Sequence, residues 1–145
     1  MKIYLATTLG KPGGIYRRNA TKAKLLLESL GHTVLAPWET KIPGAWEMSN
    51  LEWGKRVFDS DIQHIEEADG VVVLSYGRKS TAGVNWECGY AYGRGKRVLV
   101  VEMSEPKIMS LMVSNGSWAV VKGLEELEKY DFERWPKKMT QTEQK

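Results

Sequence analysis

The chain has few of the residues that build disulfides and metal sites. Its 145 residues include one cysteine, Cys88, and two histidines, His32 and His64, which lie far apart. A single cysteine excludes an internal disulfide and favours a reducing cytoplasm. Neither paired Cys-x-x-Cys motifs nor a His-Glu-x-x-His motif is present. The sequence therefore predicts no metal site.

Long apolar runs and dense basic clusters are also missing. No stretch approaches the roughly 18 consecutive apolar residues of a membrane span, and the opening MKIYLATT lacks the apolar run of a secretory signal. The net charge of +3 comes from dispersed lysines and arginines, unlike the basic stripe of a nucleic-acid-binding protein. We therefore expect a cytoplasmic protein that binds neither membranes nor nucleic acids. The length fits one domain, placed at residues 1–136, with a polar tail at 137–145.

Apolar strands alternate with amphipathic helices along the chain. Strands are expected at residues 2–7, 32–37, 70–76, 97–102 and 117–121, and helices at about 16–30, 49–68, after 80, near 107–113 and from 124. The alternation predicts an α/β fold, a parallel sheet with helices on both faces. Five strands favour the flavodoxin-like (Rossmann-like) order 2-1-3-4-5. Ligands then bind between the loops TTLGKPGG and YGRKSTAG, which follow the first and third strands.

One carboxylate is out of place in the segment after the third strand. Glu87 stands among small, aromatic and apolar residues in STAGVNWECGYA, early in the helix that leaves the expected crevice. The positive end of the helix dipole favours an ionised carboxylate there. Such a group can act as nucleophile, base or ligand anchor. The alternative is a salt-bridged glutamate on the edge of a surface helix.

A second carboxylate borders the apolar face of the helix at 49–68. Asp61 lies three residues after Phe58 and four before Ile65, which are both expected to be buried. A carboxylate beside a buried face costs free energy unless it is paired or used in chemistry. Two carboxylates flanking one crevice suit glycosidic bond cleavage, because one can attack the sugar carbon while the other protonates the leaving group.

Over nearly its whole length the chain resembles the nucleoside 2-deoxyribosyltransferase family. The resemblance rests on GVNWECGYA, on the preceding SDIQHIEEADGVVVLSY and on the opening KIYLAT. It implies that Glu87 is the nucleophile that takes the deoxyribosyl group at C1′, and that Asp61 is the acid that protonates the departing base. It also implies that the hydroxyl of Tyr4 orients the nucleophile. The alternative is that Tyr4 is an ordinary aromatic residue of the first strand. No cofactor is implied.

The family has two branches, and position 81 bears on the choice between them. Transferases of free nucleosides usually carry an aspartate six positions before the nucleophile, where this chain has Thr81. The related 5′-monophosphate N-glycosidases have a serine at this position and, after one intervening residue, a glycine. Thr81 and Gly83 match this pair. A hydroxyl beside the amides of a helix start binds a phosphate that an aspartate would repel. Further implied contacts to a phosphate or 5′-hydroxyl are Thr7, Thr8, Asn115 and Ser117, the last two from a neighbouring subunit.

The resemblance and the threonine together predict a particular reaction. The expected enzyme cleaves the N-glycosidic bond of 2′-deoxynucleoside 5′-monophosphates by double displacement, as a homodimer or larger homo-oligomer with shared active sites. Base exchange between free 2′-deoxynucleosides stays open, because the first loop lacks the arginine usual in the monophosphate branch and Asn115 also suits a transferase. In the loop at 38–47, Trp38 or Trp46 is expected to stack on the base and Glu39 or Glu47 to accept from its amino group. Alternatively, this loop only covers the sheet edge.

Two other classes of protein share this fold. A non-catalytic nucleotide-binding module would keep the phosphate loops but would not need both Asp61 and Glu87. A flavodoxin-like electron carrier would bind flavin in the same crevice, but such carriers usually have an acidic surface, which the net charge of +3 disfavours. The pair of carboxylates therefore favours an enzyme whose partner is a small nucleotide or nucleoside.

Overall fold

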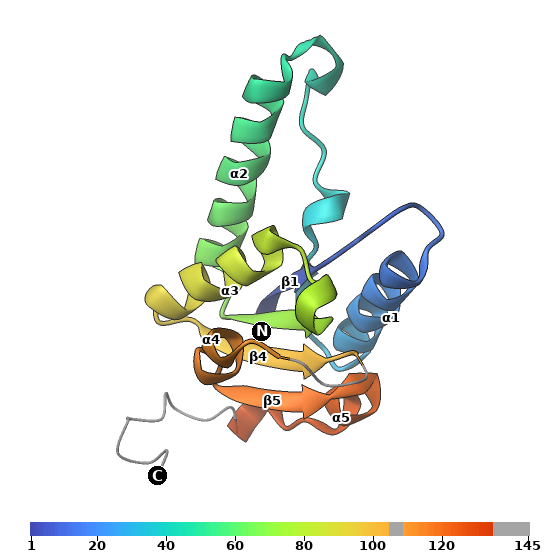
Figure 1. Cartoon of the computed structure of the whole chain (residues 1–145), viewed down its shortest axis with the longest axis vertical. Coiled ribbons are helices and arrows are strands. Elements are labelled where there is room, and N and C mark those ends of the chain that lie inside the picture. Colours follow the sequence, from blue (N-terminus) through green and yellow to red (C-terminus); the bar gives the residue numbers. More distant parts are fainter. Residues whose placement is uncertain (105–108, 135–145) are drawn as a thin grey trace.

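Five parallel strands in the order β2-β1-β3-β4-β5 form the centre of the molecule (Figure 1). The computed structural model describes residues 1–104 and 109–134. The strands are β1 (Lys2–Thr7), β2 (Thr33–Leu35), β3 (Gly70–Ser75), β4 (Arg97–Glu102) and β5 (Ala119–Lys122). Every neighbouring pair is parallel. The predicted fold class and strand order are therefore confirmed. The direction in which successive strands are added to the sheet reverses between β1 and β3.

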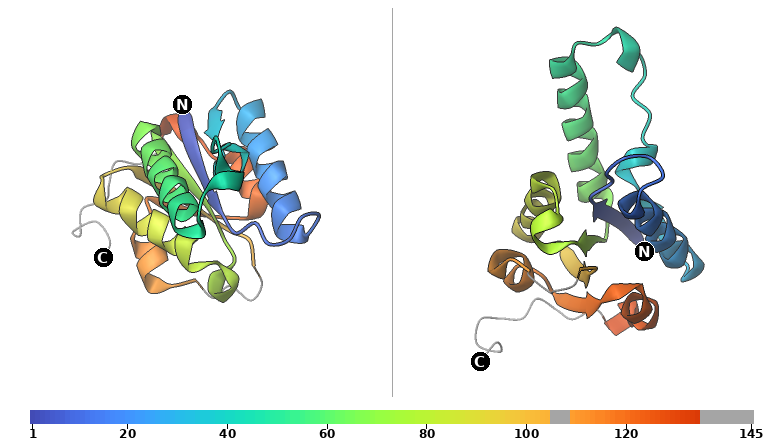
Figure 2. Two further views of the ribbon diagram at one scale, coloured as in Figure 1. Left: turned by 90° about the horizontal axis from the view of Figure 1, so that it is seen from above. Right: turned by 45° about the vertical axis from the view of Figure 1, so that its right-hand side comes forward.

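Helices cover both faces of this sheet (Figure 2). They are α1 (Ile15–Ser29), α2 (Asn50–Glu67), α3 (Ala82–Gly93), α4 (Leu111–Asn115) and α5 (Gly123–Lys129). The helix predicted near 107–113 begins later than expected, because Ser110 is its N-cap and accepts a hydrogen bond from the Met112 amide. Residues 107 and 108, like the predicted polar tail, lie outside the described residues. Among the described helices none is long and apolar enough to cross a membrane.

The sheet separates two apolar cores, and β3 contributes to both. All six residues of β3 are buried, because side chains alternate between the faces of a strand that helices cover on each side. Val72 and Leu74 join the core under α1 and α5, whereas Val71 and Val73 join the core under α2, α3 and α4. The uninterrupted run of branched residues in the sequence is the result of this double burial.

Helix α2 projects beyond the sheet (Figure 1). Its start is fixed by a capping box, in which Ser49 accepts from the Glu52 amide while Glu52 accepts from the Ser49 amide. Only Ile65 of its 18 residues is buried. The prediction that Phe58 is buried as well is wrong, since this side chain is 51% exposed. The amino-terminal half of α2 has no sheet beneath it, and Phe58 instead contacts Trp86 of α3, with ring centroids 5.4 Å apart.

Candidate active site

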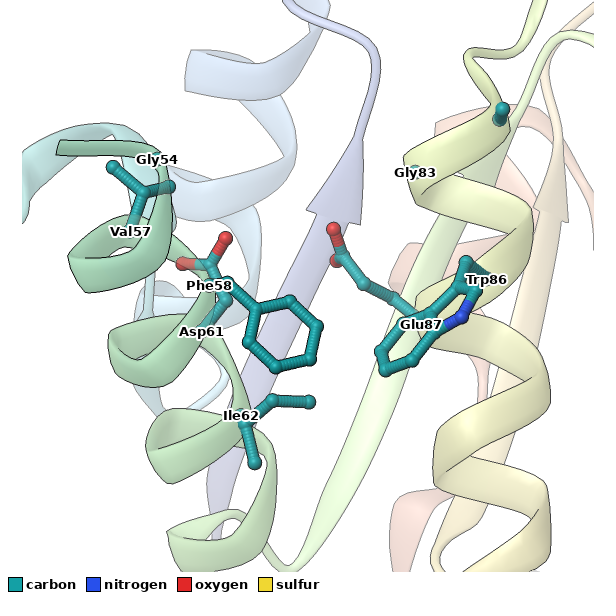
Figure 3. Close-up of a pocket in the computed structure, with 9 residues that line it drawn as sticks. Gly54, Val57, Phe58, Asp61, Ile62, Gly83, Trp86 and Glu87 are labelled. Carbon is teal, nitrogen blue, oxygen red and sulfur yellow. The ribbon is translucent and has the colours of Figure 1, made fainter. Parts of the chain in front are cut away.

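Two cavities meet at the two predicted catalytic carboxylates. Asp61 of α2 and Glu87 of α3 point into the space beyond the end of β1 (Figure 3). One cavity, here called the loop-side cavity, has a volume of about 490 Å³ and is lined by the loops after β1 and β2. The other, the interhelix cavity, has a volume of about 460 Å³ and lies between α2 and α3. Asp61 and Glu87 line both cavities, so a ligand that fills either one reaches both carboxylates.

The environment of Glu87 favours its neutral form. Burial raises the pKa of Glu87 to about 7, the nearby hydroxyl of Tyr4 opposes this shift, and the charge of Asp61 adds to it. The positive end of the α3 dipole was expected to keep this carboxylate ionised, but burial outweighs that effect. Near neutral pH a large share of the Glu87 side chains is therefore ionised and able to attack, while the charge is poorly solvated and reactive.

Asp61 is shifted in the direction that an acid needs. Burial raises the pKa of the Asp61 carboxyl, and the nearby His64, one turn further along α2, lowers it by a smaller amount. A raised pKa is the direction of shift that favours a proton donor, because it favours the neutral carboxyl. Two carboxyls that share one crevice thus have an arrangement that suits a nucleophile and an acid.

Tyr4 reaches the same crevice from β1, where its side chain is fully buried. Burial, followed by the charges of Glu87 and Asp61, raises the pKa of Tyr4, so the phenol stays neutral. Its hydroxyl has no partner in regular hydrogen-bond geometry among the described residues, yet it lies near enough to Glu87 to favour the ionised carboxylate. We interpret the pair as a contact that tightens when Glu87 is charged, as catalytic hydrogen bonds often do on ligand binding.

A hydrogen bond joins the two loops that were predicted to form the crevice. The backbone amide of Thr81 donates to Oγ1 of Thr8 at 3.0 Å, and Oγ1 of Thr7 donates to the carbonyl of Thr8 at 3.1 Å. Thr81 is the N-cap of α3, but its exposed side chain makes no capping hydrogen bond. Thr7 lines the loop-side cavity and Gly83 the interhelix cavity. Thr8, 6% exposed, lines neither of these cavities and joins the loops instead.

Asn115 and Ser117 lie away from this crevice. Nδ2 of Asn115 donates to the carbonyl of Leu111 at 2.8 Å, and Oγ of Ser117 donates to the carbonyl of Ser114 at 2.7 Å. Neither residue lines one of the two cavities. Within a single chain they therefore do not contribute to the site of Asp61 and Glu87.

The predicted base-binding residues occupy different places. Trp38 lines the loop-side cavity, whereas the carboxylate of Glu39 forms an ion pair with Lys24 at 3.1 Å and is not among the lining residues. The sequence analysis missed Trp53 and Ser60, which line this cavity from α2. They precede Asp61 by eight residues and by one, and the helical period would have placed Trp53 on its face.

Charge is distributed unevenly around the two cavities. Their lining residues include both carboxylates but no lysine or arginine of the described chain. Most other lining side chains are apolar or aromatic, among them Ile42, Trp53 and Val57. The site therefore has acidic groups in the centre, apolar walls and few polar groups, which is typical of a pocket for a small, largely uncharged ligand.

A doubly wound α/β sheet with two such carboxylates at its switch point is an arrangement that suits a glycosyl-transferring or glycosidic-bond-cleaving enzyme. This chain belongs to the nucleoside 2-deoxyribosyltransferase family, whose model matches residues 3–133. It is similar to the 2-deoxyribosyltransferase of the bacterium Bacillus psychrosaccharolyticus, with 32% identity, coverage of 97% of this chain and 99% of that one, and a TM-score of 0.83.

More distant solved structures share the fold. The CMP N-glycosidase of Clostridium botulinum is 16% identical, with coverage of 89% of this chain and 95% of that one, and a TM-score of 0.58. The deoxyribosyltransferase of Leishmania mexicana is 18% identical, with coverage of 81% and 72% and a TM-score of 0.55. Among curated proteins no sequence matches this chain. These more distant structures show that the fold is shared, and the substrate is left to the geometry of the site.

Proposed function

We propose that this protein transfers the 2-deoxyribosyl group of a free 2′-deoxynucleoside from one nucleobase to another. The observation that carries the proposal is the pair Asp61 and Glu87, which faces the junction of two cavities that no lysine or arginine among the described residues lines. In the proposed complex the nucleoside lies at this junction, with C1′ between the carboxylates. Its base then lies in the loop-side cavity against Trp38 and Trp53, and its 5′ end points past Gly83.

The reaction follows from the two carboxyl groups. An oxygen of ionised Glu87 attacks C1′, the bond between C1′ and the base nitrogen breaks, and Asp61 gives its proton to the departing base. A second base then attacks C1′ from the face that the first one left. Asp61 takes the proton of the incoming base, and the bond from C1′ to Glu87 breaks. Water in place of the second base would give hydrolysis.

The absence of a cation from the described cavity walls favours the unphosphorylated substrate. A phosphate dianion is normally held by arginine or lysine side chains, and here it would face two carboxylates instead. The apolar walls also favour transfer over hydrolysis, because they exclude the water that competes with an acceptor base. The relative that is 32% identical is named as a deoxyribosyltransferase.

A second candidate is hydrolysis of 2′-deoxynucleoside 5′-monophosphates, and Thr81 favours it. Its exposed side chain is not used as a helix cap, so the hydroxyl and the amides at the start of α3 are available to a phosphate. An aspartate at this position would repel the phosphate. This candidate differs from the first in the 5′ group of the substrate and in the acceptor of the sugar.

The products distinguish the two candidates. We expect the protein to form a new nucleoside when it is incubated with a 2′-deoxynucleoside and a second free base, and chromatography of the mixture measures it. The variant Thr81→Asp should keep this transfer and lose any action on monophosphates. Release of base from monophosphates alone would establish the second candidate, and no product from either substrate would contradict both.

We also propose that the protein is a homodimer or larger homo-oligomer, in which Asn115 and Ser117 approach the site of a neighbouring copy. The support is the exposed apolar surface beside them on α4, where Leu111 and Met112 are 79% and 82% exposed. Substitution Met112→Glu should therefore weaken assembly, and light scattering measures the change. A wild-type protein that is a fully active monomer would overturn this proposal.

A further inference from the structure

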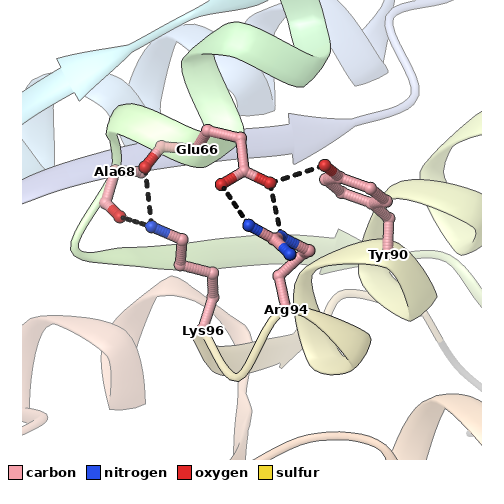
Figure 4. Close-up of polar contacts among 5 residues, drawn as sticks. All are labelled: Glu66, Ala68, Tyr90, Arg94 and Lys96. Carbon is pink, nitrogen blue, oxygen red and sulfur yellow. Dashed lines mark hydrogen bonds and ion pairs between the residues drawn. The ribbon is translucent and has the colours of Figure 1, made fainter.

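A polar cluster joins α2 to α3 at the end of their interface away from the cavities (Figure 4). Glu66 of α2 accepts from the hydroxyl of Tyr90 at 2.5 Å, and from Nε and Nη2 of Arg94 at 2.7 and 3.2 Å. Nζ of Lys96 donates to the carbonyls of Glu66 and Ala68 at 2.7 and 2.9 Å. These contacts, here called the Glu66 clamp, connect the last turn of α2 to α3 and to the segment that follows it.

Rows of side chains on α2 and α3 face each other between the interhelix cavity and the Glu66 clamp. The clamp closes the end of this interface that is far from the cavity. Along α3 and its C-cap, Trp86, Tyr90 and Arg94 follow one another at the spacing of one helical turn. The ring of Trp86 stacks on that of Tyr90, with centroids 5.4 Å apart and planes 6° from parallel. Phe58, eight residues before Glu66 on α2, meets Trp86 at the open end. The interface is therefore polar where it is closed and aromatic where it borders the interhelix cavity.

Helix α2 is anchored in the core only near its end. Ile65 is the only residue of α2 that is buried, so the core holds this helix near its end and leaves the part around Asp61 to side-chain contacts. α3, in contrast, buries Val84, Cys88 and Ala91 against the sheet. Glu87 is thus fixed to the sheet, and the position of Asp61 relative to it depends on how α2 is attached.

We propose that the Glu66 clamp positions the two catalytic carboxylates, by setting the distance between the helices that carry Asp61 and Glu87. The proposal rests on the roles of these two residues in the proposed function. Glu66, Tyr90 and Arg94 line neither cavity, so they act through the carboxylates and not on the substrate. Arg94 and Tyr90 hold the pKa of Glu66 below its usual range, and the clamp therefore stays ionised near neutral pH.

Opening the clamp should change the pKa of Glu87, which a loss of stability alone would not do. The groups that face Glu87 are Tyr4 from β1 and Asp61 from α2, and His64 faces Asp61. If α2 moves away, water reaches Glu87 and the charge of Asp61 is more distant. Both changes lower the pKa of Glu87 from its value of about 7. The pH dependence of activity then reports the geometry of the site.

The test compares Arg94→Ala and Tyr90→Phe with the wild type. In both variants we expect kcat to fall, by roughly tenfold in Arg94→Ala, and the acid limb of kcat/KM to move to lower pH. Tyr90→Phe keeps the ring that stacks on Trp86 and so guards against a misfolded variant. The matched control is Lys55→Ala, which breaks an exposed ion pair with Asp59 within α2 and should change neither quantity.

A further variant tests whether the acid limb of the kcat/KM profile reflects the ionisation of Glu87. Tyr4→Phe removes the hydroxyl that favours the ionised form of Glu87 and should move the limb to higher pH, opposite to the clamp variants. If the clamp variants lower the melting temperature but leave the limb and kcat unchanged, the clamp is structural only and the proposal is overturned. A wild-type protein without N-glycosidic activity would instead contradict the proposed function, so the two failures are distinguishable.

Discussion

The variant Glu87→Gln should be inactive, with the rate of base transfer reduced by roughly four orders of magnitude or more. An amide of the same size cannot form the bond to C1′ on which both halves of the reaction depend. Chromatography of the products measures the loss. Mass spectrometry of the wild type trapped with a donor in the absence of acceptor should also show the deoxyribosyl group on the peptide that contains Glu87, and the variant should show none.

The same variant carries its own control for folding. Because the pKa of Glu87 is raised from 4.5 to about 7, the stability that its neutral form supplies is present at acid pH and is lost as the pH rises through about 7. The ionised side chain thus costs the folded state up to roughly 3 kcal/mol at pH 8. Glu87→Gln should therefore melt at a higher temperature than the wild type at pH 8. Full activity of this variant would remove Glu87 from the mechanism.

The variant Asp61→Asn should lose roughly 10²- to 10⁴-fold in the cleavage step. Asparagine keeps the shape of the side chain but has no acidic proton for the departing base. The loss should be largest for donors whose base is a poor leaving group, and small for donors whose base departs readily without a proton. The measurement is kcat/KM of wild type and variant over a series of donors that differ in the basicity of the leaving base.

A matched substitution separates this role from a general effect of charge on α2. Asp59→Asn removes a carboxylate from the same helix, two residues away, where it forms only an exposed ion pair with Lys55 at 2.8 Å. Such pairs contribute little to stability, so this variant should behave like the wild type. An equal loss for every donor in Asp61→Asn would mean that Asp61 holds the substrate and does not protonate the base.

The sheet and the pair of carboxylates at its switch point could be predicted from the sequence for different reasons. The five strands follow from short apolar runs alternating with helices, and their order follows from the limited topologies of parallel sheets. Asp61 and Glu87 stood out because each is a carboxylate next to an apolar face. The apolar spacing along a helix does not show whether another element packs against that face. Phe58 has the spacing of a buried residue, yet α2 projects past the sheet at this position.

The loop after β2 was the least predictable part of the site. It has no apolar period from which to place its side chains, so Glu39 looked as suitable for the base as Trp38. The difference arises from Lys24 on α1, which lies near Glu39 only in the folded chain and pairs with it at 3.1 Å. The protonation of Glu87 is another such case, since the dipole of α3 is readable from the sequence whereas the burial that outweighs it depends on the whole fold.

The walls of the loop-side cavity and the core of the protein consist largely of different residues. Of its wall residues, Trp38 packs against a core, whereas Ile42, Trp53 and Ser60 belong to neither core. Mutations among these three would reshape the pocket at little cost in folding free energy. Selection on such a chain could change the preferred base step by step while the sheet and the two carboxylates are retained. Because α2 projects past the sheet, the walls of this pocket can change while the sheet stays the same.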